Sequence, residues 1–130
     1  MPELSVLIPG RNEEWLARTC ADVLEHSDLD TEVIAVIDGE HKGDVPLPHP
    51  RLRVIELRET IGQRAATNLA AREARGRFVM KLDAHCSLAQ GFDRAIVSAL
   101  DGHPDWTLIP QQRNLHVFDW ICDGCGHRTY

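Results

Sequence analysis

Two side chains that could bind a metal ion lie two positions apart at the end of an apolar segment. Residues 77–82 have the composition of a buried strand, and Asp83 and His85 follow directly. In an extended chain, residues i and i+2 point to the same side, so both side chains can reach one cation. A carboxylate with an imidazole suits Mn²⁺ or another divalent first-row metal better than Ca²⁺. The short motif also fits a strand that ends in a polar loop, so both interpretations stay open on this segment alone.

Further polar residues follow other predicted strands. The apolar residues 4–8 lead into Pro9, Arg11 and Glu13, and residues 31–37 lead into Asp38. Parallel strands place such ends on one edge of a sheet, where ligands of open α/β sheets bind. Glu13 also fits the first turn of a helix, and Asp38 before a glycine also fits a plain turn.

A helix that begins at Gly62 adds a site for an anion. Free N–H groups and the helix dipole both favour phosphate at a helix N-terminus, and Arg64 adds a full positive charge. Together with Asp38 and the Asp83/His85 pair, this combination predicts a site for a nucleoside diphosphate.

Alternating strand and helix patterns must position these residues. We expect strands over residues 4–8, 31–37, 51–57, 77–82 and 107–110. The expected helices begin after Asn12 as N-cap, at Gly62 with Gly76 as its C′ residue, and at Gly91. This alternation is typical of a mostly parallel sheet with helices on its faces, which places the chain in the α/β class.

Length and charge narrow the function classes. A chain of 130 residues has room for one domain with a real core, and its net charge of −6 argues against nucleic acid as a partner. No apolar run approaches the ~20 residues of a membrane span. The N-terminus lacks the basic-then-apolar pattern of a signal peptide, which predicts a cytoplasmic location.

Four motifs in order resemble the GT-A type glycosyltransferases of the broad family-2-like group. Residues 5–13 (SVLIPGRNE) resemble its V-I-P-x-x-N-E turn, and residues 62–68 (GQRAATN) resemble its G-K-A-x-A-x-N helix start. Residues 76–85 (GRFVMKLDAH) resemble its G-x-x-[VI]-x-x-L-D-x-D strand. The L-D-A-H-C variant at residues 82–86, followed by Gly91, is most similar to polypeptide N-acetylgalactosaminyltransferases.

The resemblance, which covers roughly residues 4–100, implies a three-layer, Rossmann-like GT-A fold that binds a UDP-sugar. Residues 1–110 would form the donor-binding half of such an enzyme, truncated relative to the family. Pro9, Arg11 and Glu13 would flank the base and ribose, and Asp38 would hydrogen-bond the uracil or ribose.

The remaining matched positions would hold the diphosphate. Gly62 and Arg64 would lie near it, and Asp83 and His85 would hold Mn²⁺ (or Mg²⁺) against it. The implied reaction transfers the sugar to a hydroxyl acceptor on a protein or glycan. The L-D-A-H pattern favours retention of the anomeric configuration by analogy only.

The segment 111–130 carries a second candidate metal site. Cys122 and Cys125 form a C-x-x-C-G turn, and with His116 and His127 they could enclose structural Zn²⁺. A reduced tail with a free cysteine pair, or a disulfide loop, fits the same residues.

A complete GT-A enzyme also needs an acceptor-binding half, and no later carboxylate in this chain stands in a general-base motif. Catalytic residues are therefore not assigned, and a partner chain could supply the missing half. A non-catalytic nucleotide-sugar-binding or assembly module of the same fold is the alternative. A dinucleotide-dependent oxidoreductase is disfavoured, because the first turn lacks G-x-G-x-x-G. A nucleotidyltransferase is disfavoured because that turn also lacks a glycine-rich basic loop.

Overall fold

A parallel four-stranded sheet forms the centre of the computed structural model, which describes residues 1–113 and 120–129. The strands are β1 (Leu4–Gly10), β2 (Thr31–Asp38), β3 (Leu52–Leu57) and β4 (Phe78–Lys81), in the spatial order β3-β2-β1-β4. The helices are α1 (Leu16–His26), α2 (Gln63–Glu73) and α3 (Phe92–Leu100). The predicted α/β class with a parallel sheet is confirmed.

The two central strands explain why the sequence forms this sheet. Every residue of β1 is buried, and β2 is buried except for one half-buried position, as expected for strands covered on both faces. β3 is mostly half-buried, and β4 alternates between half-buried and exposed residues. Within the described residues, β4 pairs only with β1, so it lies at an edge of the sheet.

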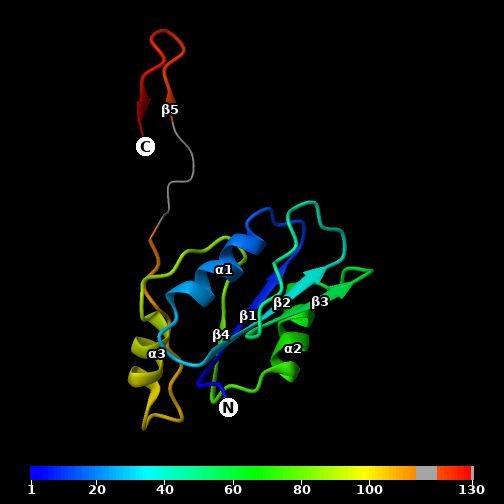
Figure 1. Cartoon of the computed structure of the whole chain (residues 1–130), viewed down its shortest axis with the longest axis vertical. Helices are drawn as coiled ribbons and strands as arrows, with labels where there is room; N and C mark the ends of the chain where they lie inside the picture. Colours follow the sequence, from blue (N-terminus) through cyan, green and yellow to red (C-terminus); the bar gives the residue numbers. More distant parts are fainter. Residues whose placement is uncertain (114–119, 130) are drawn as a thin grey trace.

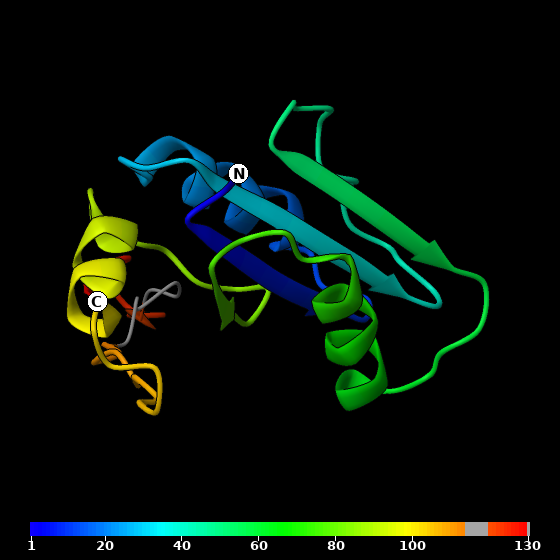
Figure 2. The ribbon, with the colours of Figure 1, turned by 90° about the horizontal axis from the view of Figure 1, so that it is seen from below.

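Helices cover the sheet on opposite faces (Figures 1 and 2). On one face, Leu16, Cys20 and Val23 of α1 pack with inward residues of β1 and β2. On the other face, Ala66 and Ala70 of α2 contact Leu7 of β1 and residues of β2. The small alanine side chains let α2 approach the sheet closely. The three-layer arrangement implied by the resemblance is therefore present.

A buried carboxylate fixes α3 to the start of β2. Asp93 is fully buried and accepts hydrogen bonds from the backbone N–H groups of Asp28 (3.0 Å), Leu29 (2.9 Å) and Arg94 (2.8 Å). The Thr31 hydroxyl donates a fourth bond of 2.7 Å. Burial alone would raise the pKa of Asp93, but these hydrogen bonds outweigh it and hold the pKa below its usual value.

The structure corrects two helix boundaries. The first helix begins at Leu16 with Trp15 as N-cap, and Asn12 instead adopts a left-handed conformation (φ 52°) in the turn after β1. Asparagine tolerates this conformation better than most residues, so the chain turns there before the helix begins. The second helix ends at Glu73 with an extended C-cap at Ala74, so Gly76 is not its C′ residue.

The predicted strand over residues 107–110 is also wrong, because these residues lie in irregular structure. Ile109 is 86% exposed, so its apolar side chain does not enter the core of the described residues. Further along, the two-residue strands β5 (Trp120–Ile121) and β6 (Arg128–Thr129) form an antiparallel hairpin. No helix in the described part of the chain is long and apolar enough to cross a membrane.

Candidate functional site

The strand ends that carry the predicted site residues meet in one cavity. The chain runs from β1 outward to β2 and β3 on one side and to β4 on the other, so the topology switches between β1 and β4. Ligands of open parallel sheets bind at such a switch point, beyond the carboxyl ends of the strands. A cavity of about 410 Å³ opens there, lined by Pro9, Gly10, Arg11, Glu13, Asp38, Thr60, Gly62, Gln63, Asp83, Ala84 and His85.

Asp38 anchors the segment that leads into α2. Its carboxylate is 3% exposed and accepts hydrogen bonds from Thr60 Oγ1 (3.0 Å) and from the N–H groups of Ile61 (2.7 Å) and Gly62 (3.0 Å). Burial would raise the pKa of Asp38, but these bonds and the nearby charge of Arg11 lower it below its ordinary value. Asp38 is therefore ionised at neutral pH, and its hydrogen bonds hold in place residues 60–62, which contribute to the cavity wall.

The N-terminus of α2 faces the cavity through Gly62 and Gln63. Gly62 is the N-cap residue with φ 90°, a conformation that L side chains rarely adopt, and no side chain caps the helix among the described residues. The first N–H groups of a helix lack intrahelical partners, so this end can bind an anion. Arg64 is exposed and is not among the residues that line the cavity.

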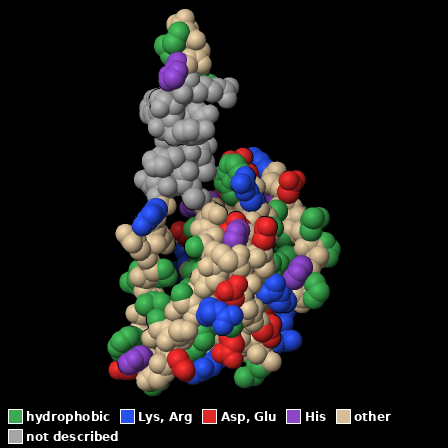
Figure 3. Space-filling view, turned by 60° about the vertical axis from the view of Figure 1, so that its left-hand side comes forward, with side chains coloured by type: hydrophobic (Ala, Val, Ile, Leu, Met, Phe, Trp, Pro, Cys, Tyr) green, Lys and Arg blue, Asp and Glu red, His purple; other side chains and the backbone are tan. Residues whose placement is uncertain are grey.

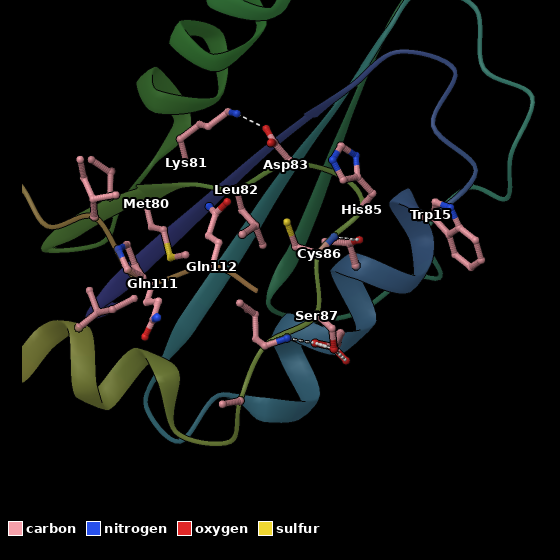
Figure 4. A pocket seen from close by; sticks show the side chains of 18 of the residues that line it. Trp15, Met80, Lys81, Leu82, Asp83, His85, Cys86, Ser87, Gln111 and Gln112 are labelled. Carbon is pink, nitrogen blue, oxygen red and sulfur yellow. Dashed lines mark hydrogen bonds and ion pairs between the residues drawn. The ribbon is translucent and has the colours of Figure 1, made fainter. Parts of the chain in front are cut away.

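Asp83 and His85 lie on the turn after β4 and line the cavity together. Asp83 forms an ion pair with Lys81, and His85 Nδ1 lies 3.2 Å from Glu13 Oε1. Figure 4 shows the Lys81 ammonium group directed at Asp83, with His85 further along the same segment. The side chains of Asp83 and His85 are 42% and 56% exposed, so both are accessible to a ligand.

The donor set at this turn fits a divalent cation that the substrate helps to hold. The described residues contain no group of three or more His, Cys, Asp or Glu side chains placed to hold a metal. Asp83 and His85 would thus give two ligands, and oxygen atoms of a diphosphate and water would complete the shell, as is common for Mn²⁺ and Mg²⁺. Such an ion would compete with Lys81 and Glu13 for these two side chains.

A broad groove continues from the cavity along the edge of the sheet. It shares Glu13, Asp83 and His85 with the cavity and runs past β4 to residues 106–113. Trp15, Met80, Leu82, Gln111 and Gln112 line it and are labelled in Figure 4. The cavity is therefore open toward the outer edge of β4 in the described structure.

Sequence reasoning missed three residues of the site. Thr60 and Gln63 line the cavity, and Lys81 pairs with Asp83. Thr60 hydrogen-bonds to Asp38, 22 residues away in the chain, so no local pattern indicates its place in the site, and Gln63 carries no signal of its own. Lys81 stands two positions before Asp83, and this spacing is the one signal for their pairing. Of the predicted donor-site residues, all but Arg64 line this cavity, namely Pro9, Arg11, Glu13, Asp38, Gly62, Asp83 and His85, and their roles in binding stay predictions.

The second candidate metal site lies elsewhere. Cys122, Cys125 and His127 belong to the turn between β5 and β6, and none of them lines the cavity. All four cysteines of the chain are free thiols. His116 lies outside the described residues, so the four-ligand zinc site stays a prediction.

Comparisons with known proteins agree with this arrangement. The model of the family described as "Glycosyl transferase family 2" matches residues 5–114. Mouse polypeptide N-acetylgalactosaminyltransferase 12 is 28% identical over 131 residues, which cover 92% of this chain and 22% of the mouse protein. The chain therefore spans less than a quarter of the length of this curated relative.

Solved structures show the same fold. The crystal structure of S. aureus TarS matches 84% of this chain and 23% of its own, with a TM-score of 0.64 and 19% identity. A TarS structure in complex with UDP-GlcNAc matches 84% of this chain and 37% of its own, with a TM-score of 0.62 and 19% identity.

Proposed function

The chain belongs to glycosyl transferase family 2, and from that membership we propose that it binds a UDP-sugar donor at the β1/β4 switch point. The single observation that carries this proposal is the cavity in which the ends of β1, β2 and β4 meet the N-terminus of α2. The cavity is lined by a carboxylate, a helix end and two side chains, Asp83 and His85, that would hold a metal ion, and these groups suit a nucleoside diphosphate. The proposed reaction is transfer of the sugar to a hydroxyl acceptor.

The choice of donor rests on the similar proteins. One solved structure of similar fold is a complex with UDP-GlcNAc, and the curated relative is named an N-acetylgalactosaminyltransferase. A UDP-N-acetylhexosamine is therefore the first donor to test, and a protein hydroxyl group is the first acceptor to test.

Residues at the ends of β1 and β2 would bind the nucleoside. Pro9 lies near the end of β1, Arg11 and Glu13 follow that strand, and all three would flank the base and ribose. Asp38 uses its carboxylate to hold the segment at Gly62, but a carboxylate has about four acceptor positions, so one remains for a ribose or uracil donor. We propose that Asp38 positions the α2 N-terminus and also contacts the nucleoside.

The start of α2 and the residues that follow β4 would bind the diphosphate. The free N–H groups at the start of α2 would stabilise its charge, with Gly62 allowing close approach, and exposed Arg64 would add attraction from outside the cavity. Asp83 and His85 would hold Mn²⁺ or Mg²⁺, which supplies positive charge to the leaving UDP. Lys81 and Glu13 would keep Asp83 and His85 in place until the donor arrives.

The acceptor surface and any general base belong to a further part of the enzyme. The chain covers 22% of the mouse relative and 23% of full TarS, which leaves most of those proteins without a counterpart here. We propose that a longer chain or a partner chain supplies them.

Calorimetry with UDP, with and without Mn²⁺, tests the donor site. We expect Mn²⁺ to strengthen UDP binding and Asp83→Asn to weaken it roughly ten- to hundredfold, because one charge-assisted contact contributes about 1.5–3 kcal/mol. Asp44→Asn, on an exposed residue of the β2–β3 loop, is the matched control.

Three outcomes would argue against parts of this proposal. Absence of UDP binding would contradict the proposed donor site. UDP binding that is equally strong with and without Mn²⁺, and equally strong in Asp83→Asn, would contradict the proposed role of Asp83 and His85 in metal binding. Binding of UDP-sugars without hydrolysis or transfer, even with the completing part present, would favour the non-catalytic module.

A further inference from the structure

The turn that joins β5 and β6 is closed by two backbone hydrogen bonds. The N–H of Cys122 donates to the carbonyl of His127 (2.9 Å), and the N–H of Gly126 donates to the carbonyl of Cys122 (2.8 Å). Gly126 has φ 70°, a conformation that favours glycine, so the residue after Cys125 lets the chain return toward Cys122. The turn therefore has a defined shape although it spans only residues 122–127. Figure 1 shows it at the end of the hairpin, apart from the sheet.

The sulfur of Cys122 lies close to the backbone of its own turn. The N–H groups of Cys125 and Gly124 donate to the sulfur of Cys122, and the Cys125 thiol also hydrogen-bonds to it. These three interactions lower the pKa of Cys122 below its usual value, in the order in which they are named. A Cβ on Gly124 would lie 3.9 Å from Cys122 Sγ, so the turn wraps closely around this sulfur.

Two cysteines three positions apart on one hydrogen-bonded turn have the spacing with which a single turn chelates a thiophilic cation. We propose that Cys122 and Cys125 together bind Zn²⁺ and supply half of a tetrahedral site. Structural Zn²⁺ takes four ligands, and C-x-x-C is the spacing with which one turn provides two of them. Both residues are exposed, so an ion can reach them without unfolding of the hairpin.

The other two ligands must come from outside this turn. The described residues contain no group of three His, Cys, Asp or Glu side chains that could hold a metal, so His127 does not join the two sulfurs in the described structure. The second half therefore comes from outside this turn, either from elsewhere in the same chain or from the same turn of a second copy. Chelation by Cys122 and Cys125 is common to both sources.

This site is chemically distinct from the proposed donor site. Asp83 and His85 offer one oxygen and one nitrogen, which suit Mn²⁺ or Mg²⁺ held partly by substrate, whereas two thiolates select softer cations such as Zn²⁺. Cys86 is near Asp83 in the chain, but burial, followed by the charge of Asp83, raises its pKa. The hairpin ion would thus be structural and independent of the nucleotide.

Titration of the fully reduced 130-residue chain with Co²⁺, followed by displacement with Zn²⁺, tests the proposal. We expect thiolate-to-cobalt charge-transfer absorption that Zn²⁺ abolishes, with loss of this absorption in Cys122→Ser and in Cys125→Ser. Cys86→Ser is the matched control and keeps the full signal. Absence of the absorption in the reduced chain, or its survival in Cys125→Ser, would overturn the proposal.

The stoichiometry of the same complex identifies the source of the other ligands. One ion per two chains, with dimers in sedimentation that dissociate on chelation, indicates a second copy. One ion per monomeric chain indicates another segment of the same chain. The proposal of a site built on Cys122 and Cys125 would be contradicted if either cysteine variant kept full metal binding while His127→Ala abolished it.

Discussion

Asp38 combines a structural task with a place in the cavity wall. Its carboxylate accepts three hydrogen bonds from residues 60–62 while Arg11 contributes a nearby positive charge. The sequence alone predicts its position at a strand end, because a carboxylate after a buried strand is visible in the pattern. Its bonds to residues 60–62 depend on the path of the more than twenty intervening residues, which include β3, and no local sequence pattern encodes that path.

Replacement of Asp38 by Asn is expected to destabilise the chain by about 2–3 kcal/mol, since an amide offers one acceptor oxygen where the carboxylate offers two and carries no charge. Urea unfolding at neutral pH measures the change through the midpoint at constant m. Asp44→Asn, exposed in the following loop, should leave the midpoint unchanged. Equal midpoints for the wild type and Asp38→Asn would show that the three bonds do not stabilise the fold.

For Asp83 and His85, prediction from the sequence is limited by an assumption about the backbone. The argument that residues i and i+2 point alike assumes an extended chain, but these residues lie on a turn after β4 ends at Lys81. Both still line the cavity, because the turn sits at the switch point. The ion pair of His85 with Glu13 could not be predicted, since Glu13 approaches His85 only through the pairing of β1 with β4.

At the scale of elements, the hydrophobic pattern predicts the central strands of the sheet well, but it predicts the structure of the segments between strands less well. Buried strands β1 and β2 have near-continuous apolar runs, so their bounds differ by at most two residues from those expected. The helix after β1 starts four residues later than Asn12, because that turn takes a left-handed residue. The apolar residues 107–110 look like a strand, but no neighbouring strand in the described structure is there to pair with them.

Gly76 has a packing role that its sequence context does not indicate. Its N–H donates to the Ser5 hydroxyl (2.8 Å), and a Cβ at this position would lie 2.6 Å from both Ser5 N and Ser5 Oγ. Ser5 Oγ in turn donates to Glu32 (2.6 Å), so a side chain at Gly76 would disturb contacts of both β1 and β2. This close approach explains why a glycine precedes β4 without a left-handed conformation.

We therefore expect Gly76→Ala to destabilise the chain by about 1–3 kcal/mol or more, the usual range for overpacking against atoms that cannot move. The control is Gly102→Ala, which adds a Cβ into open space at φ 79° and should cost about 1 kcal/mol for the backbone conformation alone. Chemical denaturation of both variants at neutral pH compares them. If Gly76→Ala lowers the free energy of unfolding by less than Gly102→Ala does, Ser5 and β1 shift easily to make room for the added Cβ.

At the scale of the whole molecule, the face seen in Figure 3 has no area in which charge of one sign gathers. On the face seen in Figure 3, acidic and basic side chains are intermixed, and no broad basic surface for nucleic acid is visible there. The acidic residues that matter for stability are instead two buried ones on different elements, Asp38 after β2 and Asp93 in α3. The net charge of −6 could be predicted from composition, but the burial of these two carboxylates could not, because each depends on backbone donors from a distant loop.

Acid should destabilise this fold through these two carboxylates. For both, the folded-state pKa lies below the ordinary value, so their stabilisation is complete above the unfolded pKa of about 3.9 and is lost as pH falls through the folded value. Unfolding free energies measured in denaturant between pH 7 and pH 3 should therefore fall most steeply below about pH 4.

The contribution of Asp93 can be separated from that of the other carboxylates. Asp93→Asn should lower the free energy of unfolding by about 2–3 kcal/mol at pH 7, because an amide cannot satisfy four donors, and should flatten the dependence on pH below about pH 4. Asp105→Asn, on an exposed residue, should keep both the stability and the slope of the wild type. Equal slopes in Asp93→Asn and wild type would mean that Asp93 has the same pKa in both states, and that the acid loss arises elsewhere.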